Sequence, residues 1–237
     1  MIFTILVCFF AGMGAGIGTG FAGMSAAAVI SPMLITFLGM DPYQAVGIAL
    51  ASDVLASAVS AYTYGKNKNL DVANGIVMMV TVLLFTLVGS YIASLLPSTT
   101  MGGFSMVMTL LLGVKFIVKP VMTTKEAMQA VSKKKRFIQS VICGMLIGFI
   151  CGFVGAGGGM MMLLILTSVL GYELKTAVGT SVFIMAFTAF TGAASHFAIG
   201  GMPDCTVWIL CFVFTLIWVN TTHRIHTVQS GMPPMAK

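Results

Sequence analysis

Charged side chains are scarce in this sequence, and their scarcity excludes a soluble globular protein. Asp, Glu, Lys and Arg make up 8% of the 237 residues, while 58% are apolar and the mean hydropathy is +1.04. A soluble domain carries about 25% charged residues, so this chain could not cover a surface that faces water. Because the apolar runs lack the alternation of outer-membrane strands, they predict an all-α, polytopic helical membrane protein. Four uncharged stretches each exceed the roughly 20 helical residues that cross a bilayer: 1–40, 72–114, 137–172 and 176–203.

Residues arranged for catalysis, metal binding or nucleotide binding are also absent from the sequence. The five cysteines form no CxxC pair and no cluster with histidine, and an odd number excludes a complete disulfide framework. There is no P-loop, no dinucleotide-binding glycine pattern and no metal-ligand spacing. We therefore expect no enzyme, no catalytic residue, no cofactor and no metal, and no hydrolysis of ATP by this chain.

The net charge of +6 is concentrated in one stretch between two apolar runs. Seven basic residues lie there, with only Glu126 opposing them. Such a cluster could suggest nucleic acid, but the positive-inside rule explains it better in a membrane protein. We therefore predict that residues 120–136 form a basic cytoplasmic loop, whose charge also attracts anionic lipid headgroups. The seven residues are Lys115, Lys119, Lys125, Lys133, Lys134, Lys135 and Arg136.

A glycine-rich apolar unit occurs twice, at a constant offset of 132 positions (148 − 16 for the first matched pair). Duplicated halves that are broken by glycine or proline at corresponding places are the sequence pointer to a transporter binding site. The matched residues of the first copy are Gly16, Gly20, Phe21, Gly23, Leu34, Leu38, Gly39, Ala45, Val46, Gly47 and Ala61. Those of the second copy are Gly148, Gly152, Phe153, Gly155, Leu166, Leu170, Gly171, Ala177, Val178, Gly179 and Ala193.

The pattern predicts two homologous transmembrane repeats, 1–119 and 137–221, followed by a polar C-terminal tail at 222–237. The helix that would correspond to 100–118 has no counterpart after residue 221, so the last helix of the second repeat is expected to be missing. The first helix lacks the basic start of a signal peptide and is too long for one, so we expect it to stay in the membrane. Long helices are expected at 2–22, 43–64, 72–96, 100–118, 137–154, 175–198 and 204–221.

Between the first and second long helix of each repeat lies an apolar segment too short to span comfortably, at 24–38 and 157–170. Ser31-Pro32 is expected to interrupt the first of them. Both segments are predicted to be broken or re-entrant helices, whose free backbone is tolerated only where it is buried in protein or lines a wet cavity. Close helix packing through small residues is the alternative. Three consecutive glycines at 157–159 destabilise a helix by roughly 3 kcal/mol relative to alanine, which favours a functional role.

The apolar core has no Arg or Lys away from the helix ends, so an anion bound there would need neutral donors. Glycine amides and helix N-termini can supply them. The second repeat contains more of these neutral donors than the first. The predicted substrate-binding residues are Gly155, Gly157, Gly158, Gly159, Thr180 and Ser181 in the second repeat, and Gly23 and Ser25 in the first.

Asp53 is the one carboxylate well inside an apolar helix. A charge at the centre of a transmembrane helix costs at least ~2.5 kcal/mol, so Asp53 is a candidate for proton coupling. The alternative is a neutral, hydrogen-bonded carboxylic acid near the interface. Its partner in the repeat is Met185, which does not support either interpretation.

The second glycine-rich segment reads Gly152-Phe153-Val154-Gly155-Ala156-Gly157-Gly158-Gly159, and is followed by Gly171 and by Ala177-Val178-Gly179-Thr180-Ser181. In these motifs the chain resembles the TauE/SafE family of sulfite-exporter-like membrane proteins. The first copy matches more loosely, with Ser31-Pro32-Met33-Leu34 at the Pro-x-Leu position, and it departs at Asp53. The chain also departs from Trp218 onward. The resemblance implies export of small sulfur-containing anions, such as sulfite or organosulfonates, across the bacterial cytoplasmic (inner) membrane.

A secondary anion transporter, with its site between the two repeats, is the leading hypothesis. A passive anion channel and a non-transporting membrane subunit are the alternatives, the latter because of the missing helix. Asp53 favours proton-coupled transport, since a passive pore needs no buried titratable group. The expected partners are a small anionic substrate and the lipid bilayer, with no nucleic acid, and a homo-oligomer is left open.

Overall fold

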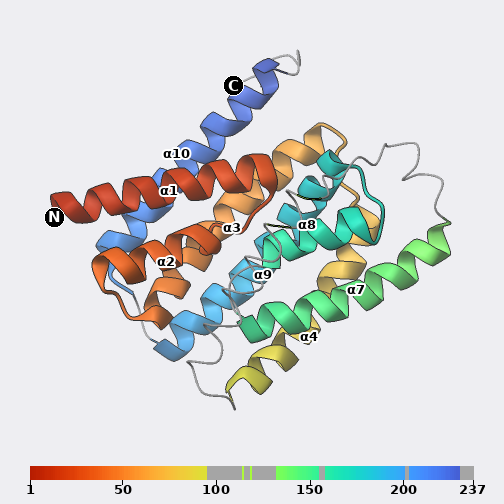
Figure 1. Cartoon of the computed structure of the whole chain (residues 1–237), viewed down its shortest axis with the longest axis horizontal. Helices are drawn as coiled ribbons and strands as arrows, with labels where there is room; N and C mark the ends of the chain where they lie inside the picture. Colours follow the sequence, from red (N-terminus) through yellow and green to blue (C-terminus); the bar gives the residue numbers. More distant parts are fainter. Residues whose placement is uncertain (95–113, 115–117, 119–131, 155–157, 201–202, 230–237) are drawn as a thin grey trace.

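The computed structural model is all-helical over the residues that it describes, which are 1–94, 114, 118, 132–154, 158–200 and 203–229 (Figure 1). The predicted helix at 100–118 and most of the basic loop lie outside the described residues. α1, α3, α9 and α10 each contain a stretch long and apolar enough to cross a membrane, and shorter apolar stretches lie in α2, α4 and α7. The helices are α1 (Ile2–Ala22), α2 (Ala27–Leu38), α3 (Pro42–Lys66), α4 (Val72–Ser94), α7 (Lys133–Val154), α8 (Gly158–Ser168), α9 (Leu174–Gly200) and α10 (Cys205–Gln229).

Three pairs of long helices form the body of the described fold: α1 packs on α10, α3 on α9, and α4 on α7 (Figure 1). α3 and α9 form the central pair, because α3 also contacts α1 and α10 while α9 also contacts α4. The two are antiparallel. Gly192 of α9 lies against Leu50 near the start of α3, whereas Gly179 lies against Tyr64 near its end.

Glycines at every fourth position allow α1 to approach α10 closely. A Cβ atom at Gly12 would lie 2.6 Å from the Cβ of Phe214, and one at Gly16 would lie 2.7 Å from the Cβ of Trp218. Small residues at this spacing let two helix backbones pack together in a membrane. The contacts advance from Gly12 to Gly16 along α1 and from Phe214 to Trp218 along α10, so the two helices are parallel. Gly144 and Gly148 of α7 face Met78 and Val82 of α4 in the same way.

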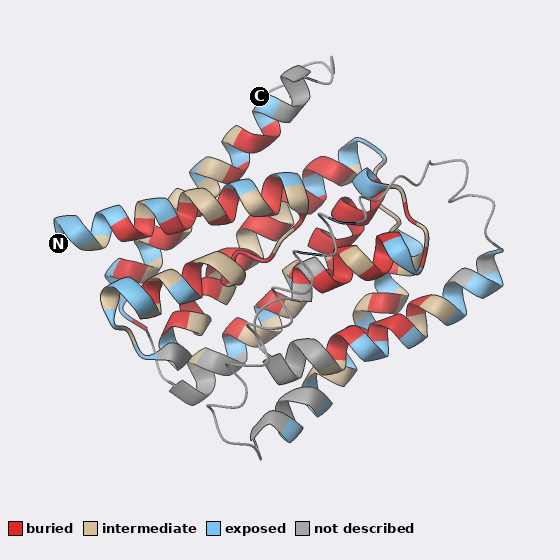
Figure 2. Ribbon diagram, in the orientation of Figure 1, coloured by how far each residue is buried: buried red, intermediate tan, exposed pale blue. Residues whose placement is uncertain are grey.

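The outward faces of the peripheral helices are apolar. Exposed side chains there include Phe10 of α1, Leu84 of α4, Ile142 of α7 and Ile217 of α10. Exposed stretches, in pale blue, alternate with buried ones along α1, α7 and α10 (Figure 2). Soluble monomers rarely expose large contiguous apolar patches. These faces are therefore suited to contact with lipid, while the interior holds small residues and hydroxyl groups.

The two short helices begin beside the middle of the two central helices. α2 starts after Ser25, whose hydroxyl bonds to Asp53 midway along α3, and α8 starts next to Gly159, which lies against Met185 midway along α9. They contain 12 and 11 residues, against 25 and 27 in α3 and α9. Each short helix therefore runs along about half of the central helix that follows it in sequence. The chain then turns back and begins that central helix. Left-handed glycines, Gly39 and Gly171, follow the two short helices.

The expected interruption at Ser31-Pro32 is wrong, because α2 continues through Pro32 from Ala27 to Leu38. Proline removes one backbone hydrogen bond, the one that would reach the carbonyl group four residues earlier. That carbonyl group belongs to Ala28, and the Ser31 hydroxyl donates to the neighbouring carbonyl oxygen of Ala27 at 2.6 Å. Packing of the buried side chains of Ile30 and Leu34 holds the helix together on either side.

Two helices extend beyond their predicted ends. α7 begins at Lys133 instead of 137, so the last four basic residues of the predicted loop form its first turn. α10 ends at Gln229 instead of 221, so the start of the predicted tail is helical. Hydropathy locates only the part of a helix that hydrocarbon surrounds. Lys and Arg are good helix formers, and backbone hydrogen bonding carries the helix on into polar sequence.

Candidate functional site

The glycine-rich segments of the two halves of the chain meet at the starts of α2 and α8. A Cβ atom at Gly159 would lie 2.7 Å from the backbone nitrogen of Ser25 and 2.5 Å from the sulfur of Met185. A Cβ atom at Gly23 would lie 2.8 Å from the hydroxyl oxygen of Ser181 on α9. Gly23 also has a φ of +61°, which residues with a side chain rarely adopt. The structure thus brings together four of the predicted binding residues.

Asp53 of α3 holds the start of α2 in place. Its side chain is 1% exposed, and its carboxyl oxygens accept hydrogen bonds from the hydroxyls of Ser25 at 2.6 Å and Ser57 at 3.0 Å. The Ser25 hydroxyl accepts from the N–H of Ala27 at 3.3 Å, and the N–H of Ala26 also interacts with the carboxyl group. The carboxyl group therefore occupies the positive end of the α2 dipole, which is also where an external anion would be stabilised.

Met185 takes the corresponding place in the second half of the chain. It is matched to Asp53 by the offset of 132, and its sulfur approaches Gly159 at the start of α8. A thioether is a weak acceptor without charge. The α9 residue that faces the start of α8 is therefore uncharged, in contrast to the carboxyl group at the start of α2.

Thr180 lies on a different side of α9 from Ser181. Its hydroxyl accepts a hydrogen bond from the N–H of Asp71 at 3.2 Å, and the carboxyl group of Asp71 accepts one from the Tyr172 hydroxyl at 2.8 Å. Consecutive residues of an α-helix are about 100° apart around its axis. Thr180 therefore joins the turn before α4, and not the cluster around Ser25.

The remaining predicted residues are only partly described. Gly155 and Gly157 lie outside the described residues. Gly158 is the first residue of α8. Its N–H group belongs to the first four of a helix, which have no acceptor within the helix itself.

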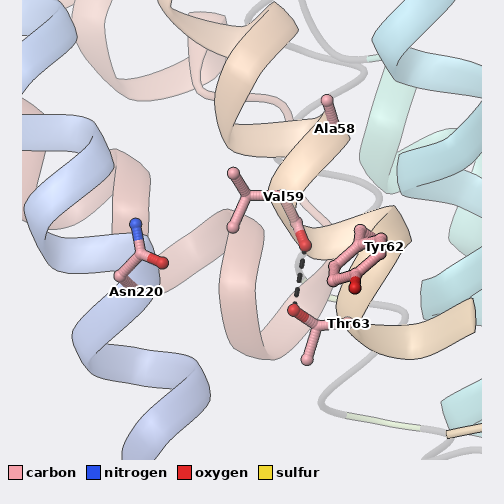
Figure 3. Close-up of a pocket in the computed structure, with 5 residues that line it drawn as sticks. All are labelled: Ala58, Val59, Tyr62, Thr63 and Asn220. Atoms are coloured by element: carbon pink, nitrogen blue, oxygen red, sulfur yellow. Dashed lines mark hydrogen bonds between the residues drawn. The ribbon is translucent and has the colours of Figure 1, made fainter. Parts of the chain in front are cut away.

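The cluster is closed in this structure. Ser25 is 8% exposed and Ser181 is 0% exposed. A pocket of about 420 Å³ between α3 and α10 includes none of the predicted binding residues. The described residues therefore leave no opening for an anion at the cluster in this arrangement. The pocket is lined by Ala58, Val59, Tyr62, Thr63 and Asn220 (Figure 3).

Sequence patterns did not single out a buried histidine on α10. His223 is 3% exposed, and its Nε2 atom lies 2.9 Å from the hydroxyl oxygen of Ser60 on α3. The ring of Tyr64 packs edge-on against the imidazole, and the Tyr64 hydroxyl donates to the carbonyl oxygen of Gly20 at 3.1 Å. His223 lies in the segment predicted as a polar tail. The available signal was the spacing of Ser57, Ser60 and Tyr64, which places three hydroxyl groups on one face of α3.

The cluster offers helix-start amides, hydroxyls and one carboxyl group. The described residues include no group of three or more His, Cys, Asp or Glu that could hold a metal ion. Helix N-termini can bind an anion without a full positive charge nearby. The arrangement is therefore suited to holding a small anion whose charge is compensated by helix dipoles and by a proton.

Comparison with known proteins finds matches along most of the chain. Residues 8–227 match the family model described as Sulfite exporter TauE/SafE. The probable membrane transporter protein YunE of Bacillus subtilis (strain 168) is 25% identical over 220 residues, which cover 84% of this chain and 80% of that protein. The probable membrane transporter protein MJ0441 of Methanocaldococcus jannaschii is 28% identical over 185 residues, which cover 76% and 65% of the two chains.

A third relative matches over a shorter segment. The probable membrane transporter protein YdhB of Bacillus subtilis (strain 168) is 44% identical over 57 residues, or 24% of this chain and 23% of that protein. No solved structure matches the chain. The family match spans nearly the whole sequence and confirms the resemblance seen in the glycine-rich motifs. This multi-pass membrane protein belongs to the TauE/SafE sulfite exporter family of membrane transporters.

Proposed function

We propose that this protein is a secondary transporter that exports small sulfur-containing anions, such as sulfite or organosulfonates, across the bacterial cytoplasmic membrane. Its substrate site lies at the starts of α2 and α8. The observation that carries this proposal is the close approach of Gly159 to the backbone nitrogen of Ser25, which brings two helix N-termini together. Each N-terminus is equivalent to roughly half a positive charge. Two of them side by side favour one small anion between them.

The contacts between helices support two repeats of opposite orientation. The pairing of α1 with α10 corresponds to that of α7 with α4, and the pairing of α2 with α3 corresponds to that of α8 with α9. Gly12 and Gly16, which face α10, are matched at the offset of 132 by Gly144 and Gly148, which face α4. The corresponding helices α3 and α9 are antiparallel, as a two-fold axis in the membrane plane requires. Rocking of one repeat against the other would open the site to the two sides in turn.

Proton coupling through Asp53 follows from its place at the start of α2. An ionised carboxylate there competes with an external anion for the same helix N-terminus, since two negative charges a few ångströms apart repel each other. A protonated Asp53 leaves the helix dipole free to stabilise the substrate. Binding of a proton and binding of an anion therefore favour each other. The two would move together, in the direction set by the sum of their gradients.

The basic residues in the described part of the chain occupy one end of the helices, and we infer that this end faces the cytoplasm. Lys66 ends α3, Lys175 begins the antiparallel α9, and Arg224 lies near the end of α10. The basic first turn of α7 joins them, because α7 runs parallel to α4 and α4 begins where α3 ends. The N-terminus of α1 then lies on the outer side. The basic residues at this end are Lys66, Lys68, Lys133, Lys134, Lys135, Arg136, Lys175 and Arg224.

This orientation predicts which cysteines react with a membrane-impermeant thiol reagent in intact cells. Cys205 is exposed at the start of α10, the opposite end from Lys134. In a chain with the other cysteines replaced by alanine, Cys205 should be labelled in intact cells. In a chain whose only cysteine comes from Lys134→Cys, labelling should require permeabilised cells. The reverse pattern would contradict the orientation.

The transport proposal is tested by flux of radiolabelled sulfite in liposomes that contain the purified protein. Ser181→Ala removes a hydroxyl beside Gly23 and should weaken the apparent affinity roughly fivefold, or about 1 kcal/mol for a neutral hydrogen bond. Thr180→Val is the matched control one position away, and it should leave the affinity unchanged because its hydroxyl faces Asp71. A larger loss of affinity in Thr180→Val than in Ser181→Ala would indicate that the anion binds nearer to α4. Absence of sulfite and organosulfonate flux in the unchanged protein would contradict the proposed function.

A further inference from the structure

The contact between His223 and Ser60 joins the end of α10 to the end of α3. His223 is the one histidine whose side chain the structure describes as buried, and Ser60 has no exposed surface. Either ring nitrogen can carry the proton in the neutral form, so Nε2 can donate to or accept from the Ser60 hydroxyl. Histidine is also the side chain whose charge changes most readily near neutral pH.

A line of hydroxyl groups on α3 leads from this contact to Asp53. Ser57 donates to the carboxyl group of Asp53 at 3.0 Å, and Ser60 lies 2.9 Å from Nε2 of His223. Ser57 and Ser60 are three positions apart and thus neighbours on one helix face, with about 5–6 Å between their Cβ atoms. A gap of this size between two polar groups is one that a single water molecule can bridge. Both serines are 0% exposed, so the line runs through the interior and not along the lipid surface.

Few other ionisable groups surround this line. α1, which packs on α10, contains no Asp, Glu, Lys, Arg or His, and its Cys8 lies toward the other end, beside Cys211. On α3 itself Tyr64 faces the imidazole, and Lys66 is exposed at the helix end. On α9, Lys175 is exposed at the helix start. On α10, Arg224 follows His223 and is exposed. Among the described residues, these are the ionisable groups on the helices that pack against the line.

We propose that His223 is the proton-transfer residue between the cytoplasm and Asp53. The imidazolium releases its Nε2 proton to the Ser60 hydroxyl, which passes its own proton through one water to Ser57, and Ser57 passes its own to the Asp53 carboxylate. Each hydroxyl gains one proton and loses one, so only the imidazolium and the carboxylate change charge. This proposal rests on the proton-coupled transport proposed above. It assigns a role to a residue that does not touch the anion site.

The test separates proton coupling from anion movement in the full-length protein in liposomes. His223→Gln keeps a side chain that can bond to Ser60 but cannot titrate near neutral pH. Sulfite counterflow at equal pH on both sides, which needs no net proton movement, should stay within about twofold of the unchanged protein. Sulfite flux driven by a pH gradient should fall by about tenfold or more, a typical effect of losing a positioned proton-transfer group. Ser60→Ala should likewise lose gradient-driven flux and keep counterflow. Asn220→Ala, at an exposed residue of α10 three positions before His223, should lose neither.

Three results would overturn the proposal. Unchanged gradient-driven flux in His223→Gln would show that the imidazole does not carry the proton. An equal loss of counterflow and gradient-driven flux in both His223→Gln and Ser60→Ala would show that the contact only joins α3 to α10. Counterflow without any response to a pH gradient in the unchanged protein would contradict proton coupling altogether, and sulfite transport would stand without it.

Discussion

Replacing Gly159 by valine is expected to abolish sulfite flux while the protein still inserts into the membrane. A side chain at this position would overlap the backbone nitrogen of Ser25, which cannot move without shifting the start of α2. Overpacking of this kind costs typically 1–3 kcal/mol, which an otherwise intact helical protein can tolerate. The valine side chain would nevertheless fill the space between the two helix N-termini, where the anion is proposed to bind. Because the anion is held by both, the site would be lost even though most of the fold remained.

Gly18→Ala supplies the matched control for this prediction, with Gly159→Ala as its counterpart. A Cβ atom at Gly18 would meet only the flexible side chain of Met24, at 3.6 Å or more. Gly18→Ala should therefore transport normally, whereas Gly159→Ala should already lose about tenfold or more of the flux, since both helix starts must shift. Membrane insertion is checked by the amount of protein in washed membranes and by its elution as a single peak in detergent. Full flux in a well-inserted Gly159→Val variant would show that the glycine serves packing and that the anion binds elsewhere.

Asp53→Asn should uncouple sulfite movement from the pH gradient. Asparagine has nearly the same shape as a protonated aspartic acid, and its amide oxygen can still accept the hydrogen bond from Ser25. The start of α2 would then be free of negative charge at every pH. We expect sulfite counterflow to continue and to lose its dependence on pH, while a pH gradient no longer drives net flux.

The sign of the effect distinguishes this role from a purely structural one. In the unchanged protein, lower pH should strengthen sulfite binding, because protonation of Asp53 removes the competing charge. In Asp53→Asn an organosulfonate, whose own charge is constant over this range, should bind equally strongly at low and at higher pH. Asp41→Asn, at an exposed carboxylate before α3, serves as the control and should keep the pH dependence of the unchanged protein. Persistence of gradient-driven flux in Asp53→Asn would leave Asp53 as a structural anchor for α2.

The bounds of the helices could be predicted well where the helix ends coincide with the ends of an apolar run. The helix expected at 2–22 has those bounds, and those expected at 43–64 and 175–198 differ from α3 and α9 by at most two residues at either end. The predictions failed at Pro32 and at the end of α10. In both places tertiary packing and backbone hydrogen bonding decided the outcome, and neither has a local signature in composition. Proline predicts a break only when nothing else supports the helix around it.

Four of the predicted binding residues are neighbours in the structure: Gly23, Ser25, Gly159 and Ser181. Gly23 belongs to the repeat, whereas the other three were predicted because hydroxyls and glycine amides are neutral donors. Thr180 and Ser181 were both predicted because they are neutral donors, yet one residue along a helix turns the side chain by about 100°. The substrate-binding roles of all these residues stay predictions that the experiments above address.

Composition and residue spacing identify a membrane protein of long apolar helices, locate most of those helices, and show which glycines recur in the two halves. These properties depend on local composition and spacing, so they can be recognised without knowing any contact between distant residues. Only the tertiary structure decided that Asp53 anchors Ser25 and that His223 meets Ser60 across 163 positions of sequence. Such contacts depend on how far each helix is rotated and how deeply it is placed against its neighbours, and close packing of the whole interior sets both quantities.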